Sequence, residues 1–301
     1  MAAEMQDIRI LRDRFVDLTY RSFEAMRCNN EVEIRRYNDT HKYTKQAKGR
    51  HMRDTILIDL QSWFQLFHPL LNKAISPTES TIDLLHGPKI SRACRVLHIH
   101  YLVLTMRLSN FGDDEARREK AFDTFGDVFE AIIQHAEEAF SNSSSSNQPP
   151  RHLLFSMEHG LIEPLYFTVL KCREPTKRAK ALQLLDSCSQ EAAWDGPLMT
   201  VIAREAVRVE TSLHGRMSCD LTGNLELVTP GDDDFRTAAE FIWKFRGDEM
   251  AEICRVFAVA LLEMDWERRT ALVQIHYKGG TVSAVCAAEI CPARQSARLD
   301  V

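Results

Sequence analysis

Two neighbouring histidines are the most metal-like feature of the sequence. His98 and His100 are separated by a single residue. This i, i+2 spacing lets two imidazoles share a metal on a strand but places them on different faces of a helix. Because residues 91–109 carry a helical apolar pattern, we expect two unrelated histidines and no metal site. Glu158 and His159 could act as an acid–base pair, but we interpret them as a capped turn before a helix.

The remaining reactive residue types do not gather into a recognisable site. Asp232, Asp233 and Asp234 are consecutive but lack the ligand spacing of an EF-hand loop, so we expect a solvated acidic loop. The eight cysteines are scattered, and only Cys286 and Cys291 lie within ten residues of each other. Structural zinc sites start from close ligand pairs, so we expect reduced thiols and no metal. The glycine-rich, zinc-protease and serine-hydrolase motifs are also missing, and we expect no catalytic residues and no cofactor.

A basic stretch is the feature best suited to binding. Its seven cations are Arg35, Arg36, Lys42, Lys45, Lys48, Arg50 and Arg53. Asp39 is the only acid between them, and such a segment could contact phosphates or act in nuclear import. The alternative is a solvated face of a helix. Because the whole chain has a net charge of −5, direct DNA binding by this single patch is doubtful.

The elements that position these residues are mostly helices. The chain has 301 residues, of which 45% are hydrophobic and 27% charged, as in ordinary globular proteins of one large or two small domains. Apolar residues recur every three or four positions in most of the chain. The predicted helices are 4–28, 52–73, 91–109, 114–140, 161–171, 175–187, 196–211 and 235–246, whereas 251–264 is either a helix or a long strand. Pro175 suits the first position of its helix, and Asp195 is a plausible N-cap.

The last segment of the chain has a different pattern. Residues 272–277 and 281–286 flank Gly279-Gly280, which predicts a β-hairpin. We therefore expect a mainly α protein, with a multi-helix bundle or solenoid-like body and a small C-terminal β-hairpin. The expected divisions are an N-terminal helical region (residues 1–140), a Ser-rich loop (residues 141–150), a C-terminal helical region (residues 151–264), the hairpin (residues 265–290) and a tail (residues 291–301).

We expect neither a signal peptide nor a membrane span in this chain. Its first ten residues carry charges where a signal peptide needs an apolar run. No stretch approaches the ~18 uninterrupted apolar residues of a membrane helix. We expect a nuclear or nucleocytoplasmic protein with no membrane partner.

A chain of short motifs between residues 121 and 210 carries a family resemblance. In order these motifs are Gly160-Leu-Ile-Glu-Pro-Leu-Tyr-Phe, then Lys171-Cys-Arg-Glu-Pro, then the basic–apolar segment 178–185, then Trp194-Asp-Gly. Together they resemble the C-terminal regulatory region of fungal zinc binuclear cluster transcription factors. The resemblance covers about 91–280, including helix 91–110 and strand 267–277, and is clearest at 155–200.

This resemblance implies a mostly helical transcriptional regulator without catalytic activity. Genes of this kind often sit beside secondary-metabolite pathways, so the resemblance permits a regulator of such a gene cluster. The helical body would bind protein partners or a small effector whose identity is unknown. The family reads DNA through six cysteines that begin C-x2-C-x6-C, and this sequence has no such cluster. The family's zinc ligands therefore have no counterpart here. The chain could act through a DNA-bound transcription factor, be a degenerate paralogue, or come from an incomplete gene model.

Two other classes of function compete with this one. The chain could be a helical scaffold or dimerisation module with no role in transcription. It could also be an enzyme with an unfamiliar site that uses Glu158, His159 or the pair His98 and His100. We favour the regulator, because its motifs occur in the family's order and no catalytic constellation is present.

Overall fold

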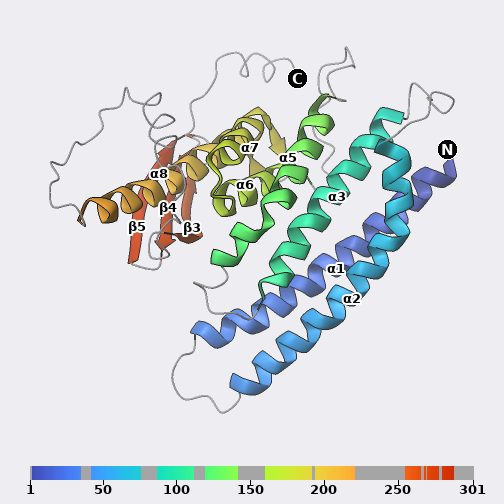
Figure 1. Ribbon diagram of the computed structural model, residues 1–301, viewed down its shortest axis with the longest axis horizontal. Coiled ribbons are helices and arrows are strands. Elements are labelled where there is room, and N and C mark those ends of the chain that lie inside the picture. Colours follow the sequence, from blue (N-terminus) through green and yellow to red (C-terminus); the bar gives the residue numbers. More distant parts are fainter. Residues whose placement is uncertain are drawn as a thin grey trace. The chain divides into compact units, whose positions relative to one another are not determined.

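The protein is described by a computed structural model and is mainly α-helical, as the sequence predicts. The structure describes residues 2–34, 42–75, 87–111, 119–141, 160–191, 194–220, 255–265, 268, 270–277 and 280–287. The chain divides into two compact units (Figure 1). Unit 1 comprises Met1–Asp114 and Asp127–Pro164, and unit 2 comprises Glu115–Gly126 and Leu165–Val301. Both units are therefore discontinuous in the sequence, which the expected division at 141–150 does not foresee.

Unit 1 is built on three long helices that lie side by side (Figure 1). They are α1 (Ala2–Ile34), α2 (Lys42–Ile75) and α3 (Gly87–Ser109). Each is longer than the prediction, which gave 4–28, 52–73 and 91–109. Most of the predicted basic stretch therefore belongs to the first turns of α2. Helix α5 (Gly126–Ser141) completes the unit.

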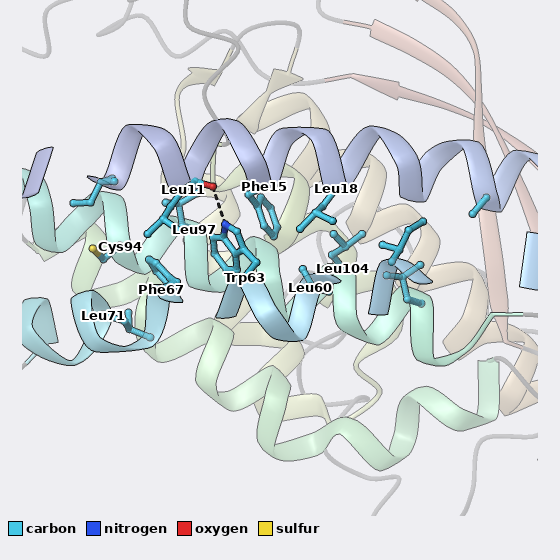
Figure 2. Close-up of a cluster of buried hydrophobic side chains, with 14 of the residues drawn as sticks. Leu11, Phe15, Leu18, Leu60, Trp63, Phe67, Leu71, Cys94, Leu97 and Leu104 are labelled. Carbon is cyan, nitrogen blue, oxygen red and sulfur yellow. Dashed lines mark hydrogen bonds between the residues drawn. The ribbon is translucent and has the colours of Figure 1, made fainter. Parts of the chain in front are cut away.

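The core of unit 1 is centred on aromatic side chains of α1 and α2 (Figure 2). Trp63 is 3% exposed and lies with its ring centroid 4.8 Å from those of both Phe15 and Phe67. Its indole Nε1 donates a hydrogen bond to the carbonyl oxygen of Leu11 at 2.8 Å. A buried indole N–H needs such a partner. Trp63 therefore joins α2 to α1 by both packing and a directed polar contact.

The predicted single helix 114–140 is interrupted after residue 121, and its first residues, 114–118, lie outside the described residues. A 3₁₀ helix, η2 (Phe122–Phe125), precedes α5, and the division between the two units falls at Gly126. Phe122 packs edge-to-face on Phe167 in unit 2, with 5.6 Å between ring centroids. The pattern of apolar residues is helical on both sides of Gly126. The apolar residues before Gly126 belong to unit 2, and those after it belong to unit 1.

Unit 2 combines the later helices with two small sheets. Its helices are α6 (Ile162–Lys171), most of which lies in this unit, α7 (Pro175–Ser187) and α8 (Gly196–Asp220). The bounds of α7 agree with the prediction. Strands β1 (Gln190–Glu191) and β2 (Trp194–Asp195) pair antiparallel immediately before α8. The Asp195 carboxylate then caps α8, because its Oδ1 accepts the backbone N–H of Leu198 at 3.0 Å.

The predicted hairpin is confirmed and belongs to a larger sheet. Strands β3 (Val256–Asp265), β4 (Thr270–Tyr277) and β5 (Gly280–Ala287) form an antiparallel sheet in the order β3-β4-β5. The sequence leaves 251–264 as either a helix or a long strand, and the structure shows strand β3 in this segment. Alternate residues of β4 are buried, and α8 packs against all three strands (Figure 1). The Ser-rich loop from residue 142, the predicted helix 235–246 and the tail 291–301 lie outside the described residues.

We expect Gly196→Ala to lower the free energy of unfolding by about 1–3 kcal/mol. A Cβ at Gly196 would lie 2.4 Å from the carbonyl oxygen of Cys188, and the Gly196 N–H donates to the Ser189 carbonyl at 3.0 Å. The backbone must shift to admit the methyl group. The matched control is Gly126→Ala, whose Cβ would have Lys177 Nζ at 3.8 Å as its nearest neighbour. Gly126 has helical backbone angles, so the control should gain about 0.5–1 kcal/mol. Equal effects in a urea titration would contradict this account.

Candidate functional site

The structure describes the side chains of three of the seven cations in the predicted basic stretch. Arg35 and Arg36 lie outside the described residues, and Lys42 and Lys45 belong to α2 without a description of their side chains. The other cations of the stretch, Lys48, Arg50 and Arg53, are described below.

Arg53 is used inside unit 1. Its Nη1 donates to the Phe111 carbonyl oxygen at 3.0 Å, and its Nη2 pairs with Asp54 at 2.7 Å. The guanidinium also lies over the Phe111 ring, 5.8 Å from the centroid, within the range of a cation–π contact. Arg53 therefore ties α2 to the residues that follow α3. Lys48 and Arg50 remain exposed on α2, so they are the described cations that can meet a partner.

His98 and His100 have separate partners, as their helical spacing predicts. The Nδ1 atom of His98 is 2.9 Å from Nε2 of His135 on α5, whereas Nε2 of His100 is 2.7 Å from the carbonyl oxygen of Gly160. Within the described ranges, no group of three or more histidines, cysteines or acids is placed to hold a metal ion. Glu158, His159 and Asp232–Asp234 lie outside those ranges.

The contact between His98 and His135 belongs to a histidine cluster, which we define as Arg95, His98, His135 and Glu138. Arg95 on α3 contacts His135 through Nη1 at 3.2 Å and also pairs with the Glu138 carboxylate. Burial lowers the pKa of His98 to about 4, and His135 and His68 add to this effect. Burial, followed by the charge of Arg95, also lowers the pKa of His135. Sequence reasoning missed this cluster, since His135 and Arg95 are far apart in the chain.

A second cluster lies in unit 2 and includes Lys171 and Arg173 of the Lys171-Cys-Arg-Glu-Pro motif. We define this buried charge network as Glu119, Asp123, Lys171, Arg173, Arg178, Glu210 and Arg255. All its glutamates, Lys171 and its arginines are buried or nearly so. An isolated charge is costly in a protein interior, so each buried charge of the network needs a partner of opposite charge. The partners are arranged around two glutamates.

Glu210 on α8 is the first centre of the network. Its side chain is 2% exposed and accepts hydrogen bonds from Arg178 at 2.8 Å, from Arg173 at 3.3 Å and from the backbone N–H of Val256 at 3.1 Å. Burial acts to raise the pKa of Glu210, but Arg178 and Arg173 outweigh it and lower the pKa. One carboxylate thus joins α7, the segment before α7, and the start of β3.

Glu119 is the second centre. Its carboxylate accepts from Lys171 at 2.5 Å and from Arg173 at 2.8 Å, and its backbone carbonyl accepts from Arg255 at 3.1 Å. Arg255 also forms two hydrogen bonds with Asp123, at 3.0 and 2.7 Å. Arg173 contacts both glutamates and therefore links the two centres. Such paired, buried charges hold the elements of unit 2 together.

Sequence reasoning did not predict this network, although three of its members lie in the motifs that carry the resemblance. Lys171, Arg173 and Arg178 are in the quoted motifs, but nothing local marks Glu119 or Arg255. The burial of Glu210 could be predicted from its position on α8. Glu210 continues the four-residue series of Leu198, Ile202 and Ala206 along the apolar face of α8, so its burial could have been expected.

Comparisons with known proteins add no support to the resemblance to fungal transcription factors, which rests on the motifs alone. No protein-family model, curated protein or solved structure matches the chain. Among the described helices, none combines the length and the apolar character that crossing a membrane requires.

Proposed function

We propose that this chain is a fungal transcription-regulator-like protein, related to the C-terminal regulatory region of zinc binuclear cluster transcription factors. It acts in the nucleus without a zinc-cluster DNA reader of its own and without catalysis, through protein partners that include a DNA-bound factor. The observation that supports this proposal best is the buried charge network, because three residues of the motifs that carry the resemblance, Lys171, Arg173 and Arg178, belong to it.

Two of the motifs, Lys171-Cys-Arg-Glu-Pro and Trp194-Asp-Gly, have physical tasks in unit 2. Lys171 and Arg173 neutralise Glu119, and Pro175 begins α7, where its missing N–H is harmless. Asp195 caps α8, and Gly196 allows the close approach of Cys188. Residues that specify a fold in this way form a pattern that related proteins would share. The motif series therefore supports common ancestry more strongly than its short pieces do separately.

The arrangement favours contact with DNA through a partner. Arg53 is committed to Asp54 and Phe111, so the described residues of the basic stretch offer only Lys48 and Arg50 to phosphates. Two phosphate contacts alone would give little electrostatic affinity for DNA. The regulator would then reach a promoter by binding another protein, and its targets would include a secondary-metabolite gene cluster.

Chromatin occupancy of the tagged protein, recorded together with its cellular location, tests this function. We expect nuclear enrichment at a discrete set of promoters. The double variant Lys48→Glu/Arg50→Glu should keep that occupancy, as should the matched control Arg9→Glu/Arg14→Glu, which makes the same charge change at exposed positions of α1. Loss of occupancy in the first variant alone would show direct phosphate contact. Nuclear exclusion with no enrichment would contradict the proposal.

A helical scaffold is the second candidate, and exposed apolar side chains favour it. Tyr20 and Phe23 on α1 are 57% and 52% exposed, and Ile58 and Leu66 on α2 are 66% and 58% exposed. Apolar residues repeated on the outer sides of helices suit contact with another protein. Strict cytoplasmic residence together with a stable oligomer in analytical ultracentrifugation would support this candidate over the regulator.

A further inference from the structure

The hydrogen bonds of the histidine cluster have a fixed direction. An arginine side chain can only donate, so Nη1 of Arg95 donates to Nδ1 of His135 across 3.2 Å. The ring proton of His135 must therefore be on Nε2. This Nε2 is 2.9 Å from Nδ1 of His98, so His135 donates and His98 accepts. The proton of His98 is then on its own Nε2, and both imidazoles are neutral.

A proton added to either ring breaks this relay. On His135 it would go to Nδ1 and turn the acceptor toward Arg95 into a second donor. On His98 it would go to Nδ1 and face the Nε2–H of His135. In both cases two N–H groups would oppose each other, and a second positive charge would arise beside Arg95. Arg95 is only 7% exposed, and its Nε is buried without a hydrogen-bond partner in the described structure.

The groups around the relay offer little compensation for a new charge. From α2, His68 adds a further basic ring near His98, and Phe64 stacks on His98 with 5.7 Å between centroids. From α3, Tyr101 stacks on the same ring at 6.1 Å. From α5, Glu138 is the acid that faces the cluster, and it already pairs with Arg95 while half-exposed.

We propose that the relay from Arg95 through His135 to His98 is an acid-sensitive latch, which holds α5 against α3 while both imidazoles are neutral and releases α5 when either is protonated. Burial lowers the pKa of both histidines. Between pH 6.5 and about 4, the closed form thus binds fewer protons than the released form. The latch therefore weakens as the pH falls through this range and is fully closed above it.

Hydrogen exchange of the whole chain tests the latch. We expect the protection of amides in α5, corrected for intrinsic exchange rates, to fall about tenfold or more between pH 7.5 and pH 5.0. Amides in the middle of α2, residues 56–67, should keep their protection, because they belong to the core around Trp63. Unchanged protection of α5 would overturn the proposal.

Amide side chains can keep the relay without a titrating ring. In His98→Asn/His135→Gln, the glutamine offers an acceptor to Arg95 and a donor to residue 98, where asparagine supplies the acceptor. We expect this variant to lose the acid response of α5. His51→Gln, at an exposed position of α2, should keep it. An acid response that persists in the double variant would contradict the latch.

The tautomers give a readout that does not depend on variants. Nitrogen-15 spectra of the unaltered protein at pH 7.5 should show His98 and His135 both protonated on Nε2. A proton on Nδ1 of either ring would reverse the direction of the relay and overturn the proposal, whether or not the double variant folds.

Discussion

Replacing Glu210 with alanine should lower the free energy of unfolding of unit 2 by about 3–5 kcal/mol, the usual cost of breaking a buried ion pair. The change leaves Arg178 without its carboxylate and removes one of the two acids that Arg173 contacts. It also leaves the N–H of Val256 without the carboxylate that accepts it. Each of these donors is buried and would lose a charge-assisted hydrogen bond. Urea titration followed by circular dichroism measures the loss.

The matched control for this substitution is on the same helix. Glu205 pairs with the exposed Arg208 at 2.6 Å, and exposed pairs contribute only about 0–1 kcal/mol. Glu205→Ala should therefore change stability little. A second variant, Arg178→Met/Glu210→Met, should lose less than the sum of its two single changes, because neither partner is left as an unpaired buried charge. Comparable losses from Glu210→Ala and Glu205→Ala would show that the network is not a stabilising centre.

Trp63→Ala should destabilise unit 1 by about 3–5 kcal/mol, as expected for a large aromatic removed from a closed core. The cavity would lie between Phe15 and Phe67, and the carbonyl of Leu11 would lose the indole N–H. Trp63→Phe keeps most of the packing and should cost about 1 kcal/mol for the hydrogen bond.

Trp194 provides the control for this prediction. It is 38% exposed and contacts Tyr166 at 6.4 Å between centroids, so Trp194→Ala should cost about 1 kcal/mol or less. Both variants are compared by denaturant titration. A larger loss at Trp194 than at Trp63 would mean that the core does not depend on the aromatic cluster of α1 and α2.

The sequence predicts most helices because their apolar residues repeat at helical spacing. The N-terminal Pro175 and the cap Asp195 locate two helix starts for local reasons, and Gly279-Gly280 locates the hairpin. The segment 251–264 stayed ambiguous because a continuous apolar run suits both a strand and a buried helix. Its pairing with β4 is a long-range property that no local spacing specifies.

The clusters of the candidate sites are harder to predict than the helices. Glu119 pairs with Lys171, which is 52 residues away, and His98 contacts His135, which is 37 residues away. A charged residue in an apolar stripe shows that a partner is needed but does not show which one. For the basic stretch, the sequence showed the cations correctly, but it did not show that Arg53 is occupied by Phe111 and Asp54.

The residues of the buried charge network are far apart in the sequence, and this separation determines which unit can fold first during synthesis. The aromatic core of α1, α2 and α3 needs no residue beyond Phe111, so it can form early. Glu119 must instead wait for Arg255, 136 residues later, which takes on the order of ten seconds at ~5–20 residues per second on the ribosome. During that interval the backbone carbonyl of Glu119 and the carboxylate of Asp123 lack the arginine that they contact in the folded unit. Unit 2 should therefore be the slower unit to mature and the one that depends most on chaperones in the cell.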